Sequence, residues 1–331
     1  MSNFLTTASF TRDELYALIN NALEFKFQAR DVRPLNGKSV ALVFFNPSLR
    51  TRASMQVAIY DLGGNAVLLE PGSTSWTLEH RENIIMDGAK TEHLKEFVQV
   101  LERYVSAIGV RTFAALENWE EERGDPILSA FERFAVKPII NLESAMHHPC
   151  QAMADMMTIN EHFGKEKRTV LLTWAWHPKA LPMAVPNSFA LATAQFGHNL
   201  RIAHPPGFEL DEVLIDAVRF QAAQNGGSVE IFDDPIAAYE GADVVYAKSW
   251  GSKGFYGDME GEAALRSGYR NNWIVDEKKM ARTKNGKFMH CLPVRRNVIV
   301  TDAVIDSANS LVIDEAENRL HIQKAILEKI V

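Results

Sequence analysis

Short apolar segments alternate with amphipathic segments along almost the whole chain of 331 residues. The apolar segments have the length and flanking turns of strands, and helical spacing of apolar residues follows most of them. The predicted strands lie near residues 39–45, 65–69, 107–110, 138–141, 169–174, 199–203, 229–232, 244–247 and 311–313. Strands separated by helices form parallel sheets covered on both faces. The pattern therefore predicts an α/β fold with mostly parallel sheets flanked by helices.

The predicted strands fall into two groups. A polar, turn-prone stretch at 163–168 separates them and suits a domain boundary. The first strand of neither group is followed by the glycine-rich dinucleotide fingerprint, which disfavours a nicotinamide cofactor. A helix is predicted to begin after Thr11, because Thr11 and Glu14 have the spacing of a capping box.

The composition suits two domains with hydrophobic cores, since 47% of the residues are hydrophobic. A formal net charge of −7 argues against a nucleic-acid partner. Only two cysteines occur, Cys150 and Cys291, so no disulfide framework is expected and a reducing compartment is the default. Neither a secretion signal nor an apolar run long enough to span a membrane is evident. A cytoplasmic protein with no membrane partner is the expectation.

The segment 45–52 joins the first predicted strand to an amphipathic helix. Ser48, Arg50, Thr51 and Arg52 then lie on the first helical turn. Free backbone N–H groups and the positive end of the helix dipole favour an anion there, and arginine pairs bidentately with phosphate oxygens. The segment indicates a phosphate site. The alternative is a surface helix capped by Ser48 with solvated arginines.

Two further clusters carry chemistry-bearing side chains. The segment 143–151 opens another predicted helix, with Pro149 in its first turn, so that His148 and Gln151 point together from the helix start. These side chains suit donation to a carbonyl oxygen and recognition of an amide. The segment 288–297 is a short strand that ends in a turn containing Cys291. The alternatives are a helix-capping histidine with a core glutamine, and a buried structural cysteine.

Three motifs together identify a resemblance to one family. They are Ser48-Leu49-Arg50-Thr51-Arg52, His148-Pro149-Cys150-Gln151 and His290-Cys291-Leu292-Pro293, in the order and spacing of the aspartate and ornithine carbamoyltransferases. The resemblance runs over essentially the whole chain. The stretches 44–48, 86–88, 173–178, 246–251 and 291–297 resemble the branch that acts on N-acetylornithine or N-succinylornithine. It implies a carbamoyl phosphate domain at 1–150, joined by a closing helix near 318–331, and an acylornithine domain at 151–317.

The resemblance also implies roles for individual residues, without a cofactor, a metal or a covalent enzyme intermediate. Arg111, His148, Thr51 and Cys291 would form the reacting centre, with Cys291 lining the amine pocket. The carbamoyl phosphate site would consist of Ser48, Leu49, Arg50, Thr51, Trp76, Arg111, His148, Gln151, Cys291, Leu292 and Arg319. The alternative for Arg111 is a solvated arginine in a loop, and the alternative for Arg319 is an exposed charge at a helix start.

The acylated amino acid would be held by another set of residues. Ordinary ornithine carbamoyltransferase carries an aspartate and a Ser-Met-Gly loop for the free α-amine, whereas Lys248 stands here and suits a carboxylate. The α-amine is therefore expected to be acylated. Glu143 could accept from the substrate amide, and Asn187 and Lys179 are weaker candidates, with a helix cap and a solvated lysine as alternatives.

The family pattern implies roles for two more residues. Trp76 would reach a neighbouring subunit's phosphate site, which implies a homotrimer; the alternative is a tryptophan folded onto its own domain. Thr91 stands where a glutamate accompanies the acetyl substrate, so the small neutral threonine favours N-succinylornithine over N-acetylornithine. The adjacent Glu92 reverses that argument if the register slips by one.

Three functions follow. The first is an N-acylornithine carbamoyltransferase that makes N-acylcitrulline and phosphate in arginine biosynthesis. The second is an ordinary ornithine carbamoyltransferase. The third is a phosphate-anion-binding regulator on the same fold, without catalysis.

Overall fold

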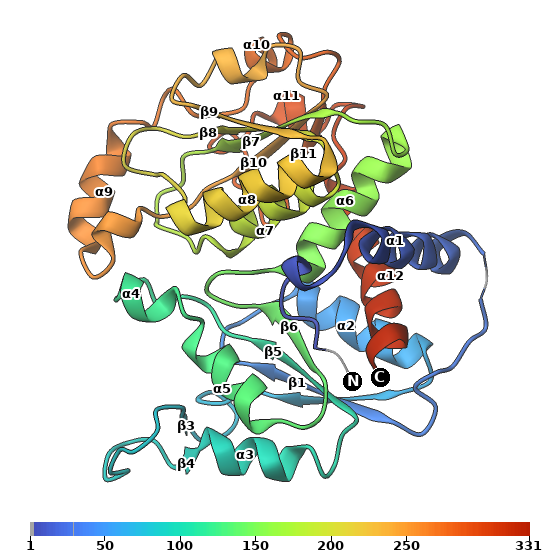
Figure 1. Ribbon diagram of the computed structural model, residues 1–331. Coiled ribbons are helices and arrows are strands. Elements are labelled where there is room, and N and C mark those ends of the chain that lie inside the picture. The colour runs from blue at the N-terminus through green and yellow to red at the C-terminus, as the bar shows by residue number, and fades with distance from the viewer. Residues whose placement is uncertain (1–2, 29) are drawn as a thin grey trace.

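The computed structural model describes residues 3–28 and 30–331 and contains two parallel sheets with helices packed against them (Figure 1). The first sheet has the strand order β2-β1-β5-β6, and every neighbouring pair is parallel. Its strands are β1 (Ser39–Phe44), β2 (Asn65–Leu69), β5 (Ala107–Arg111) and β6 (Ile139–Glu143). Each end lies within two residues of the predicted one. A small parallel pair, β3 (Leu78–Glu79) and β4 (Glu92–His93), stands apart from this sheet.

The second sheet has the order β11-β10-β7-β8-β9 and is also parallel throughout. Its strands are β7 (Thr169–Trp174), β8 (Asn199–Ala203), β9 (Ser228–Phe232), β10 (Val244–Lys248) and β11 (Lys287–Met289). The predicted strand at 311–313 is wrong. Ser310 forms a single bridge with Phe288, and the chain then turns into a helix that leaves Ile313 71% exposed.

Helices cover both sheets, as the alternating pattern predicted (Figure 1). The capping box at Thr11 and Glu14 is confirmed. Along the first half run η1 (Thr7–Ser9), α1 (Arg12–Phe27), α2 (Arg50–Asp61), α3 (Leu94–Leu101), α4 (Trp119–Glu122), α5 (Pro126–Phe134) and α6 (Pro149–Phe163). The second half contains α7 (Ala184–Gln195), α8 (Glu212–Asn225), η2 (Ala237–Tyr239), η3 (Lys253–Phe255), α9 (Met259–Ser267), α10 (Glu277–Met280), α11 (Asp302–Ile305) and α12 (Val312–Ile330).

The closing helix α12 returns from the second sheet to pack beside α1, α2 and α6, as expected (Figure 1). It begins at Val312, six residues earlier than the predicted start near 318. The additional turn matters because it carries Glu315 into the interior, where its side chain is completely buried. Helix α12 thus brings residues from the end of the chain to the start of α2 and α6.

The hydrophobic core lies between the sheets and their helices. Strands β1, β5 and β7 are buried over almost their whole length, as expected for parallel strands covered on both faces. In such sheets the ligand sites form beyond the carboxyl ends of the strands. The loops that follow β1, β5, β6, β10 and β11 are therefore the places to look for a site. No helix in the described part of the chain combines the length and the apolar character that a membrane crossing requires.

Candidate active site

A cavity of about 310 Å³ lies where these strand ends and helix starts meet. It brings together most of the residues that the sequence singled out. They are Ser48, Arg50, Thr51, Arg111, Glu143, His148, Gln151, Lys248, Cys291, Leu292 and Arg319. The three motifs, which are more than two hundred residues apart at their extremes, therefore share one site. This convergence is what the family resemblance predicted.

The start of α2 forms one end of the cavity. Leu49 is the N-cap residue and no side chain caps the helix, so Ser48 does not have the capping role of the alternative interpretation. The first backbone N–H groups of the helix consequently lack a side-chain acceptor. Leu49 contributes only backbone here, because its side chain is 81% exposed and does not line the cavity. This end of the cavity suits an anion.

Three guanidinium groups surround the same end. Burial lowers the pKa of Arg50 and of Arg111, and each is lowered further by the charge of Arg319. The groups repel one another, and an anion between them would relieve that repulsion. Arg50 forms no ion pair with any described residue, so its fork is free to bind oxygen atoms. Arg111 and Arg319 each have a buried Nε without a hydrogen-bond partner in the described structure.

His148 stands at the start of α6 between these cations. Its side chain does not cap the helix, so the alternative of a helix-capping histidine is wrong. Its backbone N–H donates to Ser188 Oγ over 2.8 Å. Burial and the charges of Arg319 and Arg111 hold the pKa of the imidazole well below its usual range. The ring is therefore neutral near pH 7 and can donate one N–H. Glu143 Oε2 lies 3.4 Å from His148 Nε2 and also accepts from Arg111 Nη1.

Arg319 links α12 to both of the other helices. Its Nη1 donates to Gln151 Oε1 over 2.6 Å, and its Nη2 donates to Thr51 Oγ1 over 2.9 Å. Arg319 is only 4% exposed, so the alternative of a solvated arginine at a helix start is wrong. The contact fixes the spacing between the start of α2 and the start of α6.

The turn after β11 closes the cavity. Leu292 has a φ of +54°, a left-handed conformation that a leucine rarely adopts, and its N–H donates to His290 Nδ1 over 2.8 Å. Burial lowers the pKa of His290, which keeps its Nδ1 available as an acceptor. The strained residue lines the cavity, and strained backbone of this kind is common at functional sites. Burial also raises the pKa of the Cys291 thiol, so the neutral form prevails near pH 7 and does not favour nucleophilic attack by sulfur.

Besides Leu49, four predicted residues do not line the cavity. Asn187 is completely buried behind it and donates to the carbonyl oxygen of Met146 over 3.1 Å. The Lys179 side chain is exposed, and its backbone N–H donates to His177 Nδ1. Trp76 and Thr91 lie by the β3–β4 pair. The indole of Trp76 is 56% exposed and donates to Glu92 Oε2 over 2.6 Å.

The cavity also contains residues that the sequence analysis did not select. They are Pro47, Phe113, His177, Leu181, Pro182, Val185, His290, Pro293 and Ile299. His177 accepts a hydrogen bond from Arg295 Nε over 3.0 Å and so joins the two sides of the second domain. The sequence could have pointed to His177 and Arg295, since both lie in stretches that resemble the N-acylornithine branch. The apolar members carry no local sign of chemistry, and only the fold brings them to the site.

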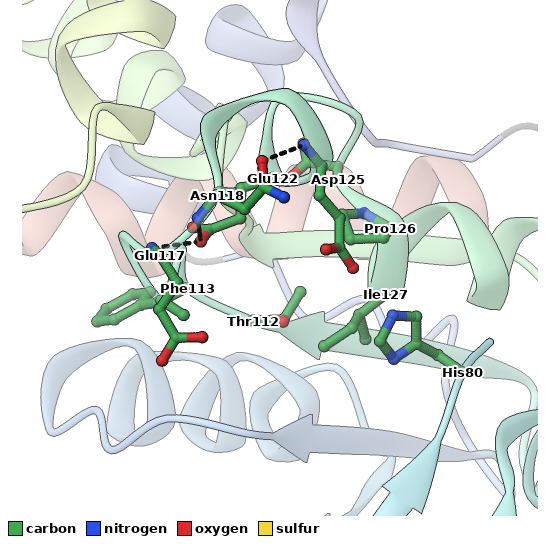
Figure 2. A pocket seen from close by; sticks show the side chains of 12 residues that line it. His80, Thr112, Phe113, Glu117, Asn118, Glu122, Asp125, Pro126 and Ile127 are labelled. Carbon is green, nitrogen blue, oxygen red and sulfur yellow. Dashed lines mark hydrogen bonds between the residues drawn. The ribbon is translucent and has the colours of Figure 1, made fainter. Parts of the chain in front are cut away.

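A second cavity, of about 180 Å³, is also lined by Phe113 (Figure 2). Its polar lining is acidic, with Glu117, Glu121, Glu122 and Asp125. Glu122 is engaged by the backbone N–H groups of residues 116–118. These carboxylates repel a phosphate, so the first cavity suits an anion better than the second.

Fold and cavity together define an α/β protein with two parallel sheets and an arginine-lined cavity that suits a small anion. Two family models match the chain: the aspartate/ornithine carbamoyltransferase carbamoyl-P binding domain over residues 2–161, and the Asp/Orn binding domain of the same family over residues 182–330. The chain belongs to the aspartate/ornithine carbamoyltransferase family. It is a carbamoyltransferase of the N-acylornithine branch, as the following relatives show.

Curated relatives from both parts of that branch match over most of their length. N-acetylornithine carbamoyltransferase of Xanthomonas campestris pv. campestris is 46% identical, over 100% of this chain and 98% of the relative. N-succinylornithine carbamoyltransferase of Bacteroides fragilis is 41% identical, over 88% of this chain and 87% of the relative.

Solved structures agree with the sequence relatives. An acetylornithine transcarbamylase complexed with acetylcitrulline matches with a TM-score of 0.97 and 45% identity, over 100% of this chain and 99% of that chain. A mutant of N-acetyl-L-ornithine transcarbamylase, with a glutamate replaced by alanine, is complexed with carbamyl phosphate and N-succinyl-L-norvaline. It matches with a TM-score of 0.96 and 46% identity, over 100% of both chains.

Proposed function

We propose that this enzyme transfers the carbamoyl group of carbamoyl phosphate to the δ-amine of an N-acylated L-ornithine. The observation that carries the proposal is the single cavity in which three arginines and a neutral histidine meet the free start of α2. The products are N-acylcitrulline and phosphate, and the expected context is arginine biosynthesis. In the proposed division of labour, residues 1–150 with α12 hold carbamoyl phosphate and residues 151–317 hold the amino acid.

The cavity suggests how the substrate is held. The phosphate binds the amides at the start of α2 and the side chains of Ser48, Arg50 and Thr51. Arg111 and His148 donate to the carbonyl oxygen as negative charge develops there. Gln151 Oε1 and the carbonyl oxygen of Leu292 are the acceptors for the carbamoyl NH₂ group.

Transfer then needs an uncharged amine. An alkylammonium group has a pKa near ~10.4, so only a small fraction is neutral near pH 7. The amine nitrogen forms a bond to the carbamoyl carbon, the bond from that carbon to the phosphate oxygen breaks, and the departing phosphate accepts the amine proton. This route requires no attack by Cys291, which is consistent with its raised thiol pKa.

The proposal is tested by supplying carbamoyl phosphate with N-acetylornithine, N-succinylornithine or ornithine. Phosphate release is expected in step with N-acylcitrulline, and free ornithine is expected to react poorly. Equal rates with ornithine would identify the ordinary ornithine enzyme. Binding of carbamoyl phosphate without product from any amine would identify a regulator.

Lys248 lies at the end of β10 in the cavity and is the proposed partner of the substrate carboxylate. Replacing Lys248 by alanine is expected to raise the KM for the acylornithine roughly 10–100-fold, because one charge-assisted contact is lost. The KM for carbamoyl phosphate is expected to change little. Steady-state kinetics with each substrate varied in turn measures both values.

Lys253→Ala is a matched control for the lysine variant. Lys253 lies outside the cavity and pairs with the exposed Glu212 over 2.7 Å. Its loss is expected to leave both KM values unchanged. An unchanged acylornithine KM in the Lys248 variant removes the assigned role.

Thr91 is the proposed determinant of the acyl group, with N-succinylornithine preferred over N-acetylornithine. Thr91 directly precedes β4, which begins at Glu92, and its N–H donates to the carbonyl oxygen of Thr77, so the two adjacent side chains are expected to point to opposite sides. Glu92 is already engaged by Trp76, which supports Thr91 as the residue that meets the acyl group. The relative with a glutamate replaced by alanine, complexed with N-succinyl-L-norvaline, also supports a glutamate as the group that excludes succinyl. The higher identity of the N-acetylornithine relative favours the acetyl group instead, so the rates with the two acylornithines must be compared directly.

Replacing Thr91 by glutamate is expected to lower kcat/KM for N-succinylornithine roughly 10–100-fold, since two carboxylates would be brought together. The value for N-acetylornithine is expected to stay within a few-fold. Thr91→Gln is the uncharged control of the same length, and it is expected to retain more succinyl activity than the glutamate variant. If the ratio of kcat/KM for N-succinylornithine to that for N-acetylornithine is the same in Thr91→Glu as in the wild type, the assignment is wrong.

We also propose a homotrimer in which Trp76 reaches a neighbouring active site. The position of Trp76 supports this, since a large indole is 56% exposed beside its own β4 and outside the cavity of its own chain. Leu49, at the start of α2, and Tyr60, near its other end, are 81% and 79% exposed and add apolar surface along this helix.

A further inference from the structure

The orientation of the Gln151 amide is determined by three neighbours. Its Nε2 donates to Asp155 Oδ1 over 2.7 Å and to Glu315 Oε1 over 2.9 Å. Its Oε1 accepts from Arg319 Nη1 over 2.6 Å. Reversing the amide would place two acceptors against its oxygen and a donor against its nitrogen. The network therefore fixes the amide oxygen on the side of Arg319, which lines the cavity.

Asp155 on α6 and Glu315 on α12 form a pair of completely buried carboxyl groups. Burial raises the pKa of Asp155 to about 7 and that of Glu315 well above its usual range. Two adjacent buried carboxyls share a proton rather than both ionise. Glu315 keeps the proton, and Asp155 Oδ2, which lies unpaired near the Tyr246 hydroxyl in the described structure, is available to accept it.

The second oxygen of Glu315 controls another part of the site. Glu315 Oε2 accepts from the backbone N–H of His290 over 2.9 Å. His290 in turn accepts from Leu292 N and sets the left-handed turn that carries the Leu292 carbonyl. One buried pair therefore supports both acceptors that the proposed function assigns to the carbamoyl NH₂ group.

We propose that Asp155 and Glu315 are positioning residues that hold Gln151 Oε1 and the Leu292 carbonyl as paired acceptors, and thereby select a carbamoyl NH₂ group over a methyl group of the same size. The inference rests on the proposed function. A methyl group cannot donate, so it would leave both acceptors unpaired in a buried site. Neither Asp155 nor Glu315 lines the cavity. Their effect is therefore exerted through Gln151 and the 290–292 turn.

The two carboxyl groups respond differently to replacement by an amide. Glu315 accepts at both oxygens, from Gln151 and from His290, whereas a glutamine has one acceptor oxygen. Glu315→Gln therefore forces either Gln151 to reverse or the His290 N–H to lose its acceptor. Asp155→Asn keeps Oδ1 as the acceptor for Gln151, and its new N–H can donate to an ionised Glu315. The same single negative charge remains in both variants.

The test compares carbamoyl phosphate with acetyl phosphate, which has a methyl group in place of NH₂. Glu315→Gln is expected to weaken carbamoyl phosphate binding roughly tenfold or more, and to change acetyl phosphate inhibition by no more than about twofold. Asp155→Asn is expected to retain most of the wild-type preference for carbamoyl phosphate. Isothermal titration gives the binding constants, and competition in the transferase assay gives the inhibition constants.

Stability is measured alongside, because the pair is buried. If Glu315→Gln does not fold, Asp155→Ala serves instead, since it removes one acceptor of the Gln151 N–H₂ group. A folded Glu315→Gln or Asp155→Ala variant that prefers carbamoyl phosphate as strongly as the wild type overturns the inference. Equal weakening of both ligands also overturns it, because that is the effect of general disorder in the site. Inactivity of the wild type with every amine would instead refute the proposed function.

Discussion

Replacing Arg50 by alanine is expected to raise the dissociation constant of carbamoyl phosphate roughly 10²–10³-fold, because a desolvated arginine that binds phosphate oxygens is lost. The variant is expected to fold normally. Arg50 forms no ion pair with a described residue, so its removal leaves no carboxylate unpaired. It also relieves the repulsion among Arg50, Arg111 and Arg319. Titration calorimetry and thermal denaturation measure the two effects separately.

Arg52→Ala provides the comparison within the same helical turn. Arg52 Nη1 pairs with Glu70 Oε1 over 2.7 Å, and the side chain does not line the cavity. Its removal is expected to change the dissociation constant of carbamoyl phosphate by no more than about threefold, since exposed ion pairs contribute at most about 1 kcal/mol. Similar losses of affinity in the two variants would show that helix charge in general, and not the cavity, binds the ligand.

Replacing His148 by alanine is expected to lower kcat roughly 10²–10³-fold, as one donor to the developing oxyanion is removed. Carbamoyl phosphate binding is expected to suffer less, because the phosphate contacts remain. His148→Gln, which keeps an N–H donor, is expected to recover part of the rate. His147→Gln alters the adjacent histidine, which does not line the cavity, and is expected to retain most of the activity. Single-turnover measurements separate the chemical step from binding.

The pH profile gives a second readout for His148. Its pKa is lowered by burial, so the ring stays neutral as the pH falls through 6.5. A protonation step of His148 is therefore not expected near pH 6.5 in kcat. At higher pH, the rate with subsaturating acylornithine is expected to rise because more of the amine is neutral. An acid limb near pH 6.5 that disappears in His148→Gln would contradict a neutral donor.

The sequence allowed much of the fold to be predicted because strand lengths, helix starts and turns are local. The capping box at Thr11 and eight strands were predicted closely. The failure at 311–313 is instructive, since the apolar residues there resemble a strand but belong to the first turn of α12. Leu311 and Val312 are buried because the helix packs on distant elements, which local periodicity does not encode.

The sequence by itself determined which chemical groups are available: arginines at a helix start, a histidine before a proline, and a cysteine in a strand-end turn. Only the tertiary structure decided which of them meet. It joined Arg319 to Thr51 and Gln151, paired Arg111 with Glu143, and left Asn187 and Lys179 outside the cavity. It also buried Asp155 against Glu315. The physical reason is that pairing and burial depend on packing between elements, whereas side-chain chemistry and helix starts depend on adjacent residues.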